Sequence, residues 1–306
     1  MALDITSSYA GEFSGKYISA ALLSASTLDK GLITVMPNVK YKSVLQVASY
    51  DDIVANAGCD YSSSGTLTLT EKVITPEEFQ VNVTMCKKEL VDAWQAQQMG
   101  FSAFKDMPSS LSDFIIAHTA AKVASRLETN IWNGVNATAG QFDGFYTLAT
   151  AGGSGCVAVS GTPVTATNVI DELGKIVDAV PTAVYGKEDL LIYVAPNIAR
   201  AYVRALGGFV ATIGGAGVDN KGTSWYTNGE LSFDGIPVVV AQGMPASSAM
   251  AAQKSNMFFG TGLLNDTNEV RLIDTSNTLG DQNVRIVMRF TAAVAMGINS
   301  DVVIYS

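Results

Sequence analysis

The sequence NVRIVMRFTAAVAMG, from Asn283 to Gly297, has the alternation of one long β-strand. In its first half, apolar residues occupy every second position, at Val284, Ile286, Met288 and Phe290. Arg285, Val287 and Arg289 fill the positions between them. Because neighbouring side chains of a strand point to opposite sides, one side is apolar and the other carries two arginines. The pattern predicts a strand that covers a hydrophobic core with one face only.

The remainder of the C-terminal part also has strand composition. Three further segments are rich in apolar and β-branched residues: NMFFGTGLL (256–264), NEVRLID (268–274) and DVVIYS (301–306). Upstream of them, FDGIPVVVAQGMP (233–245) combines a turn with a buried strand. We therefore expect the C-terminal third to consist mainly of sheet.

A long helix is expected near the middle of the chain. The segment FIIAHTAAKVASRLETNIWNG (114–134) follows Pro108 and two serines of the kind that cap helices. Its apolar residues recur every three or four positions, at Ile116, Ala120, Val123, Leu127 and Ile131. This spacing places them in one stripe along a helix. About 24 residues with a rise of 1.5 Å each give a rod of roughly 36 Å.

Residues 165–208 have the pattern of an α/β core. A helix is expected over 165–180, with six inward residues, Val169, Ile170, Leu173, Ile176, Val177 and Val180. The buried strand DLLIYV (189–194) follows, and then a helix that starts near Pro196 and stops at Gly207 and Gly208. The glycine-rich stretch 207–229 is expected to be a loop.

The N-terminal third has little core of its own. Residues 1–30 predict an arm with one short amphipathic helix, Phe13 to Ser24, and residues 32–85 predict one long, irregular β-hairpin with its turn at 56–65. An isolated hairpin is only marginally stable in water, and ordering each residue costs on the order of 1–2 kcal/mol of backbone entropy. Such projections become favourable when neighbouring copies bury them.

Composition excludes several classes of function. The 306 residues contain 19 basic and 28 acidic side chains, a formal charge of −9, and no cluster of basic residues, so we expect no tight or sequence-specific nucleic-acid binding. No apolar run approaches 18 residues, and the first residues do not form a secretory signal, so we expect no membrane partner. Three widely spaced cysteines (Cys59, Cys86 and Cys156) and one histidine make a zinc site improbable.

No catalytic, cofactor-binding or metal-binding residue is predicted. His118, the single histidine, lies off the apolar stripe, in a row with Phe114, Lys122 and Arg126, with no acidic residue one turn away to orient it. The glycines of 214–224 lack the order of a phosphate-binding loop, and 152–156 lacks the last glycine of a nucleophile elbow. The acidic pairs Asp51–Asp52 and Glu77–Glu78 are adjacent on strands and therefore face opposite sides. We expect a protein that is not an enzyme.

Four segments resemble the major capsid proteins of tailed bacteriophages, with the Hong Kong phage-type shell fold that encapsulins and herpesvirus capsids share. They are LDKGLITVMPNVKYK (28–42), FDGIPVVVAQGMP (233–245), KSNMFFGTGLLNDTNEVRLID (254–274) and GDQNVRIVMRFTAAVAMGINSDVVIY (280–305). The resemblance implies an α+β fold with four parts: an N-terminal arm (1–30), an extended β-hairpin loop (31–88), a peripheral domain with a long spine helix (89–154 and 271–306), and an α/β axial domain (155–270).

The resemblance also implies a function. Many copies would form pentamers and hexamers of an icosahedral shell around double-stranded DNA, assembled in the host cytoplasm and retained in the virion. Scaffolding, portal and decoration proteins are the further partners that the family implies. Because Met1 leads directly into the arm, scaffolding is expected to be a separate protein or absent. Two alternatives stay open: an encapsulin-like nanocompartment shell, and a monomeric enzyme or binding module with an unrecognised site.

Overall fold

The structure is a computed structural model. It describes residues 26–39, 41–51, 53–54, 56, 59, 65–86, 109–206, 231–262, 271–275, 280–281 and 283–306. The expected arm helix, most of the hairpin turn and the glycine-rich loop lie outside these residues.

Five α-helices and two short 3₁₀ helices are described. The α-helices are α2 (Ser26–Asp29), α5 (Ser109–Asn133), α6 (Phe145–Thr150), α7 (Val169–Asp178) and α8 (Pro196–Leu206). The 3₁₀ helices are η1 (Lys254–Asn256) and η2 (Asn299–Asp301).

A five-stranded sheet is built around the predicted long strand. Its members are β1 (Thr34–Met36), β4 (Glu77–Cys86), β10 (Met257–Thr261), β11 (Arg271–Asp274) and β12 (Asn283–Met296). Successive parts of one β12 edge pair with β11 and β10, and its other edge pairs with β4. Val284, Ile286 and Met288 are buried whereas Arg285 and Arg289 are exposed, so the predicted alternation is confirmed.

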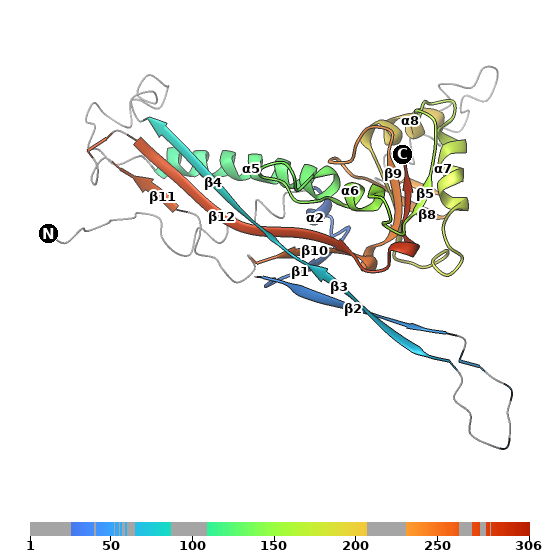
Figure 1. Cartoon of the computed structure of the whole chain (residues 1–306). Helices are drawn as coiled ribbons and strands as arrows, with labels where there is room; N and C mark the ends of the chain where they lie inside the picture. Colours follow the sequence, from blue (N-terminus) through green and yellow to red (C-terminus); the bar gives the residue numbers. More distant parts are fainter. Residues whose placement is uncertain are drawn as a thin grey trace.

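The apolar face of this sheet packs on the long helix α5 and on α6. The predicted helix is confirmed, with 25 residues. Ile116, Leu127 and Ile131 of its stripe are at most 3% exposed. Leu127 and Ile131 share one core with Trp132 and with the inner residues of β12. Figure 1 shows α5 running alongside β12 and β4, with the sheet on one side of the helix.

The α/β unit contains a six-stranded mixed sheet. Its members are β5 (Val157–Val159), β6 (Leu190–Val194), β7 (Leu231–Phe233), β8 (Ile236–Val240), β9 (Ala249–Gln253) and β13 (Val303–Tyr305), in the order β5-β13-β9-β6-β8-β7. One face packs on α7 and α8, and the other joins the core around Trp132. Ile170 was expected to point inward but is 50% exposed, because it lies at the edge of the apolar stripe in the first turn of α7.

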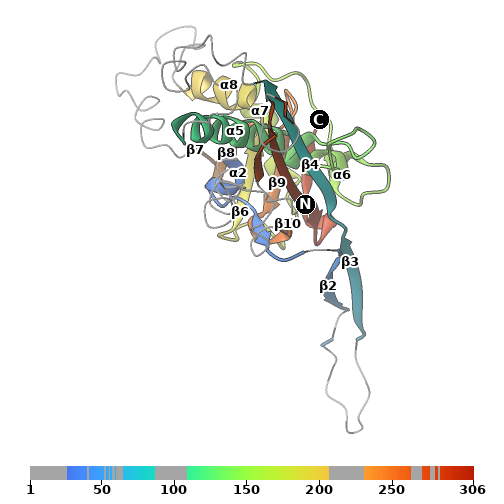
Figure 2. The ribbon, with the colours of Figure 1, turned by 90° about the vertical axis from the view of Figure 1, so that its left-hand side faces the viewer.

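The projecting hairpin is shorter than predicted. It is a two-stranded ribbon of β2 (Ser43–Tyr50) and β3 (Leu67–Ile74), and it extends away from the body (Figures 1 and 2). The flanking strands β1 and β4, which the sequence placed in the same hairpin, belong to the five-stranded sheet. The change of partner occurs at Thr75 and Pro76, because proline has no N–H group to continue a ladder. Beyond it, apolar residues of β4 pack on the core.

The two sheets do not follow the expected domain ranges. β10 lies within 155–270 but belongs to the five-stranded sheet, whereas β13 lies within 271–306 but belongs to the six-stranded sheet. The division into peripheral and axial domains therefore stays a prediction.

Candidate assembly surfaces

The ribbon exposes one face that is mainly apolar. Directly opposed residues of β2 and β3 share a face, and Val44 pairs with Val73 while Ala48 pairs with Leu69. Between these pairs lies the polar pair of Gln46 and Glu71. We call this face the apolar ribbon face, with the members Val44, Gln46, Ala48, Leu67, Leu69, Glu71 and Val73.

The apolar residues of this face are unusually exposed for the surface of a monomeric protein. Leu69 is 61% exposed, Val73 51% and Val44 49%. Single exposed apolar residues are ordinary, but a contiguous group on a projection marks an interaction site. No third strand pairs with either ribbon strand among the described residues. The ribbon therefore offers side chains and strand edges to another molecule.

The base of the ribbon is fixed to the body through a close contact with the five-stranded sheet. Ile74 is only 1% exposed, and its Cγ2 atom lies 3.2 Å from the position that a Cβ atom would take on Gly260. The backbone N–H of Val39 donates to the carbonyl of Thr261 at 3.1 Å. Because Gly260 has no side chain, the ribbon base is able to lie directly on β10. This contact sets where the ribbon leaves the body.

A buried carboxylate joins the end of the N-terminal segment to the long helix. Glu128 of α5 is 5% exposed and accepts hydrogen bonds from the N–H of Thr27 at 3.0 Å, from its hydroxyl at 2.6 Å, and from the hydroxyl of Ser26 at 3.0 Å. The indole N–H of Trp132 donates to the Thr27 hydroxyl at 2.8 Å. The donors satisfy the charge without a cation, so α2 is held at a fixed place on α5.

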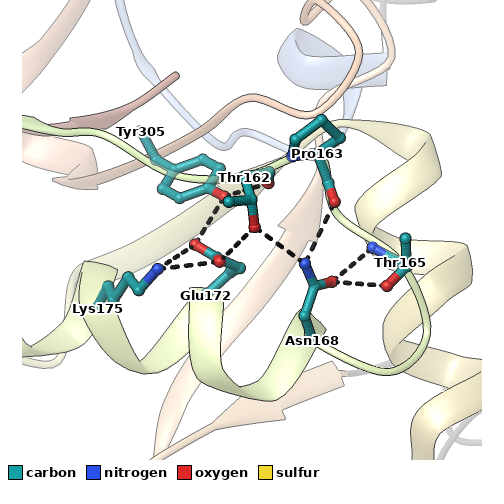
Figure 3. A network of polar contacts seen from close by, with 7 residues as sticks. All are labelled: Thr162, Pro163, Thr165, Asn168, Glu172, Lys175 and Tyr305. Carbon is teal, nitrogen blue, oxygen red and sulfur yellow. Dashed lines mark hydrogen bonds and ion pairs between the residues drawn. The ribbon is translucent and has the colours of Figure 1, made fainter.

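A second buried carboxylate fastens the C-terminal strand to α7 (Figure 3). Glu172 accepts hydrogen bonds from both the Lys175 ammonium and the Thr162 hydroxyl, at 2.9 and 2.8 Å, and lies 2.9 Å from the Tyr305 hydroxyl. Burial alone would raise the pKa of Glu172, but these hydrogen bonds outweigh it and hold the pKa below its ordinary value. Burial and the neighbouring carboxylate raise the pKa of Tyr305 to about 12.

The described residues do not form a recognisable catalytic constellation. His118 lies on the exposed side of α5 with Lys122 and Arg126, as predicted, and Phe114 lies outside the residues whose side chains are described. Cys59, Cys86 and Cys156 are free thiols. Glu77 and Glu78 differ in exposure, as expected for adjacent strand residues.

Three further observations concern binding. In the described part of the chain, no three His, Cys, Asp or Glu side chains gather closely enough to hold a metal ion. No helix of the described residues has the length and apolar character needed to cross a membrane. A shallow groove beside α8 is lined by Pro196, Ala199, Arg200, Val203, Arg204, Leu231, Val240 and Gln242.

Known structures share this architecture. The chain is similar to a structure from Gordonia phage Cozz, with a TM-score of 0.59 and 13% identity over 92% of this chain and 86% of that one. It is similar to the capsid of a native GTA particle, with a TM-score of 0.59 and 16% identity over 92% and 90%. It is also similar to the procapsid of satellite phage P4, with a TM-score of 0.57 and 10% identity over 95% and 98%. Neither a protein-family model nor a curated protein matches the chain.

These matches define the class of fold. The mixed α+β architecture, with a sheet-rich body, is similar in fold to the capsid and procapsid structures named above. More particularly, the likeness covers nearly the whole chain and most of each known structure, so it concerns the fold as a whole. At these low identities the likeness concerns the fold and does not extend to individual residues.

Proposed function

We propose that this protein is the major shell subunit of a tailed phage, with the Hong Kong phage-type fold. In this proposal, copies form pentamers and hexamers of an icosahedral shell, assemble in the host cytoplasm, and enclose double-stranded DNA in the virion. The observation that supports it most directly is the apolar ribbon face, which projects from the body and stays exposed in a single copy. Head-to-tail contacts between copies would bury this face and close the subunits into rings.

The parts of the chain receive roles in the same proposal. Residues 1–30 are the arm, and 31–88, with the β2–β3 ribbon at its centre, are the extended loop. The peripheral domain comprises 89–154 and 271–306, with α5 as its spine helix, and 155–270 form the axial domain. The protein acts mechanically and is not an enzyme.

The charge of the chain is suited to a DNA container. A net charge of −9 disfavours strong binding of phosphates to the wall, which would hinder the movement of DNA during filling. Portal, decoration and scaffolding proteins are further partners in this proposal. An encapsulin-like shell would instead enclose protein cargo.

The function is tested by the size and content of particles formed by the full chain. Gel filtration and electron microscopy should show closed shells, whereas a stable species near 32.1 kDa at all concentrations would favour the monomeric module. Protein cargo in place of DNA, in particles purified from the natural source, would favour the encapsulin-like alternative.

The ribbon is tested by Leu69→Ser and Val73→Ser. Each residue is about half exposed, so burial of the remainder by a neighbour is worth roughly 1 kcal/mol per contact. Since every subunit repeats the contact, the double variant should stay folded and soluble but give few particles in electron micrographs. Thr70→Ser, on the opposite ribbon face, is the matched control. Normal particle numbers from the double variant would remove the ribbon from the assembly contacts.

A further inference from the structure

The two faces of the five-stranded sheet are covered to different extents. Its apolar face packs on α5 and α6, and the opposite face is covered at one end by Ile74 and Val39 of the ribbon base, which lie over Gly260. Along the rest of that face, the described side chains of Gln80, Asn82 and Thr84 in β4 and of Arg285 and Arg289 in β12 are exposed. We call this part of the sheet the arginine face, with the members Arg285, Val287 and Arg289 of β12, Gln80, Asn82 and Thr84 of β4, and Ile273 of β11.

The composition of the arginine face favours a protein partner. Arg285 and Arg289 are exposed, and half-buried Val287 lies between them. Arginine, with its planar fork of donors, is enriched in protein interfaces, where it pairs with carboxylates, whereas lysine is depleted there. Opposite Arg285, Val287 and Arg289, the β4 row contributes three uncharged polar groups, and Glu78 follows them on the same face. Sheets that bind single-stranded nucleic acid typically present aromatic rings for stacking, and none is among the named members of the arginine face.

The charge on this face is only partly balanced within the chain. Asp281 lies close enough to Arg285 to interact with it electrostatically. Arg289 makes no ion pair with any described residue, although Glu78 lies on the same face two register positions away. Arg289 is exposed, with Gln80 directly opposite it, and is therefore available to a carboxylate from another molecule. The chain itself, with its net charge of −9, would be the most abundant source of carboxylates in a shell.

The apolar ribbon face has the complementary pattern. Glu71 is the only charged member of that face, and it lies between Leu69 and Val73 along β3. On the arginine face the order is reversed, with an apolar residue between two arginines. Alternate residues of a strand are about 7 Å apart in both cases, so the two patterns have the same spacing. Laid face to face, Glu71 meets an arginine while one of its two apolar neighbours meets Val287.

The ribbon cannot reach the arginine face of its own chain. It leaves the sheet at Ile74, and the β2–β3 ribbon extends away from the body (Figures 1 and 2). Its base nevertheless already packs on the same side of the sheet, through Ile74 over Gly260. A ribbon from a second copy would continue this layer along the arginine face.

We propose that the arginine face receives the apolar ribbon face of a second copy of this chain, with Glu71 pairing to Arg289 or Arg285. The inference rests on the proposed shell function and adds the receiving surface. Because donor and acceptor are different surfaces of identical chains, the contact is head-to-tail and repeats around a ring.

The test is a charge exchange in the full chain. Glu71→Arg and Arg289→Glu, made separately, should each lower the yield of particles at least about tenfold, the effect of about 1.4 kcal/mol on an equilibrium constant. The double variant E71R/R289E restores opposite charges and should recover most of the yield, and E71R/R285E serves as a second pair. E71R/R126E is the matched control, because Arg126 is an exposed arginine on α5, away from the arginine face. Urea unfolding of each variant verifies that the subunits are folded.

The outcomes separate the inference from the proposed function. Failure of both exchanges to restore particles, or equal rescue by E71R/R126E, overturns the pairing while the wild-type particles still support the shell. Absence of particles from the wild-type chain contradicts the shell function itself. If Arg285→Glu and Arg289→Glu leave particle yield unchanged but lower the nucleic-acid content of the particles, the arginine face contacts nucleic acid and the inference is wrong.

Discussion

Removal of one hydroxyl group, by Tyr305→Phe, tests how the C-terminal strand is held to the α/β unit. Tyr305 is 1% exposed, and its hydroxyl lies 2.9 Å from both the Glu172 carboxylate and the Thr162 carbonyl. The substitution keeps the aromatic ring, so core packing is preserved and only the polar contacts change. Glu172 retains its bonds to Lys175 and Thr162 but loses one donor.

The size of the effect follows from the buried carboxylate. A hydrogen bond to a charged group contributes about 1.5–3 kcal/mol, and its removal here leaves Glu172 partly unsatisfied in a buried position. The Lys175 partner limits the loss, since its side chain still neutralises the charge. We expect the free energy of unfolding to fall by about 2 kcal/mol.

The measurement is urea unfolding of dispersed subunits at neutral pH. Tyr185→Phe is the matched control, because Tyr185 is 53% exposed and should change the free energy of unfolding by less than about 0.5 kcal/mol. A loss for Tyr305→Phe as small as that of the control would refute the role assigned to the network.

The same pair of groups gives the pH dependence of this loss. The pKa of Glu172 is lowered on folding, so its stabilising contribution is complete above the ordinary pKa of 4.5 and disappears as the pH falls through the lower folded value. The pKa of Tyr305 is raised from 10.0 to about 12, so its contribution is complete below pH 10 and is lost as the pH rises toward 12. The difference between wild type and Tyr305→Phe should therefore be largest between these limits and shrink on both sides. A difference that is constant from pH 3 to pH 11 contradicts this account.

Substitutions at two further sites, Glu128 and Gly260, test the other anchoring contacts. Glu128→Ala removes the acceptor of three donors from Ser26 and Thr27 and should lower the free energy of unfolding by about 3 kcal/mol in urea, whereas Glu188→Ala, at an exposed site, should have little effect. A loss below about 1 kcal/mol for Glu128→Ala would argue against a fixed α2. Gly260→Val places methyl groups against Ile74 and should cost about 1–3 kcal/mol and reduce particle yield, with Gly260→Ala intermediate; equal stability of both variants and wild type would contradict the close contact at the ribbon base.

The helix α5 and the strand β12 could be predicted from the sequence because the spacing of their apolar residues indicates which side is buried. In α5 the apolar stripe recurs with the helical period, and the buried residues are those that the period selects. In β12 the alternation of Val284, Arg285 and Ile286 identified both faces correctly. The exposed side of His118 followed from the same helical period.

The strand partners could not be predicted in the same way. The alternation of β4 fits the second strand of the predicted hairpin as well as a sheet with β12, since both arrangements place the same residues on the apolar side. Burial of Phe79 and Val81 against the core decided for β12, and the hairpin became a shorter ribbon. Ile170 was misplaced for a related reason, because a residue at the edge of a stripe is buried only if a neighbouring element reaches it.

The anchoring contacts left no signal in the sequence. Thr27 and Glu128 are 101 positions apart, and Glu172 and Tyr305 are 133 positions apart. No local sequence pattern distinguishes any of these residues. A carboxylate becomes an anchoring contact only when folding removes water from it and supplies hydrogen-bond donors from distant segments. The sequence by itself determined the helix and strand periods, the acidic balance and the lack of a core in the projecting hairpin. Tertiary structure alone decided the strand pairing, the buried polar partners and the arginine face, because these depend on contacts between segments distant along the chain.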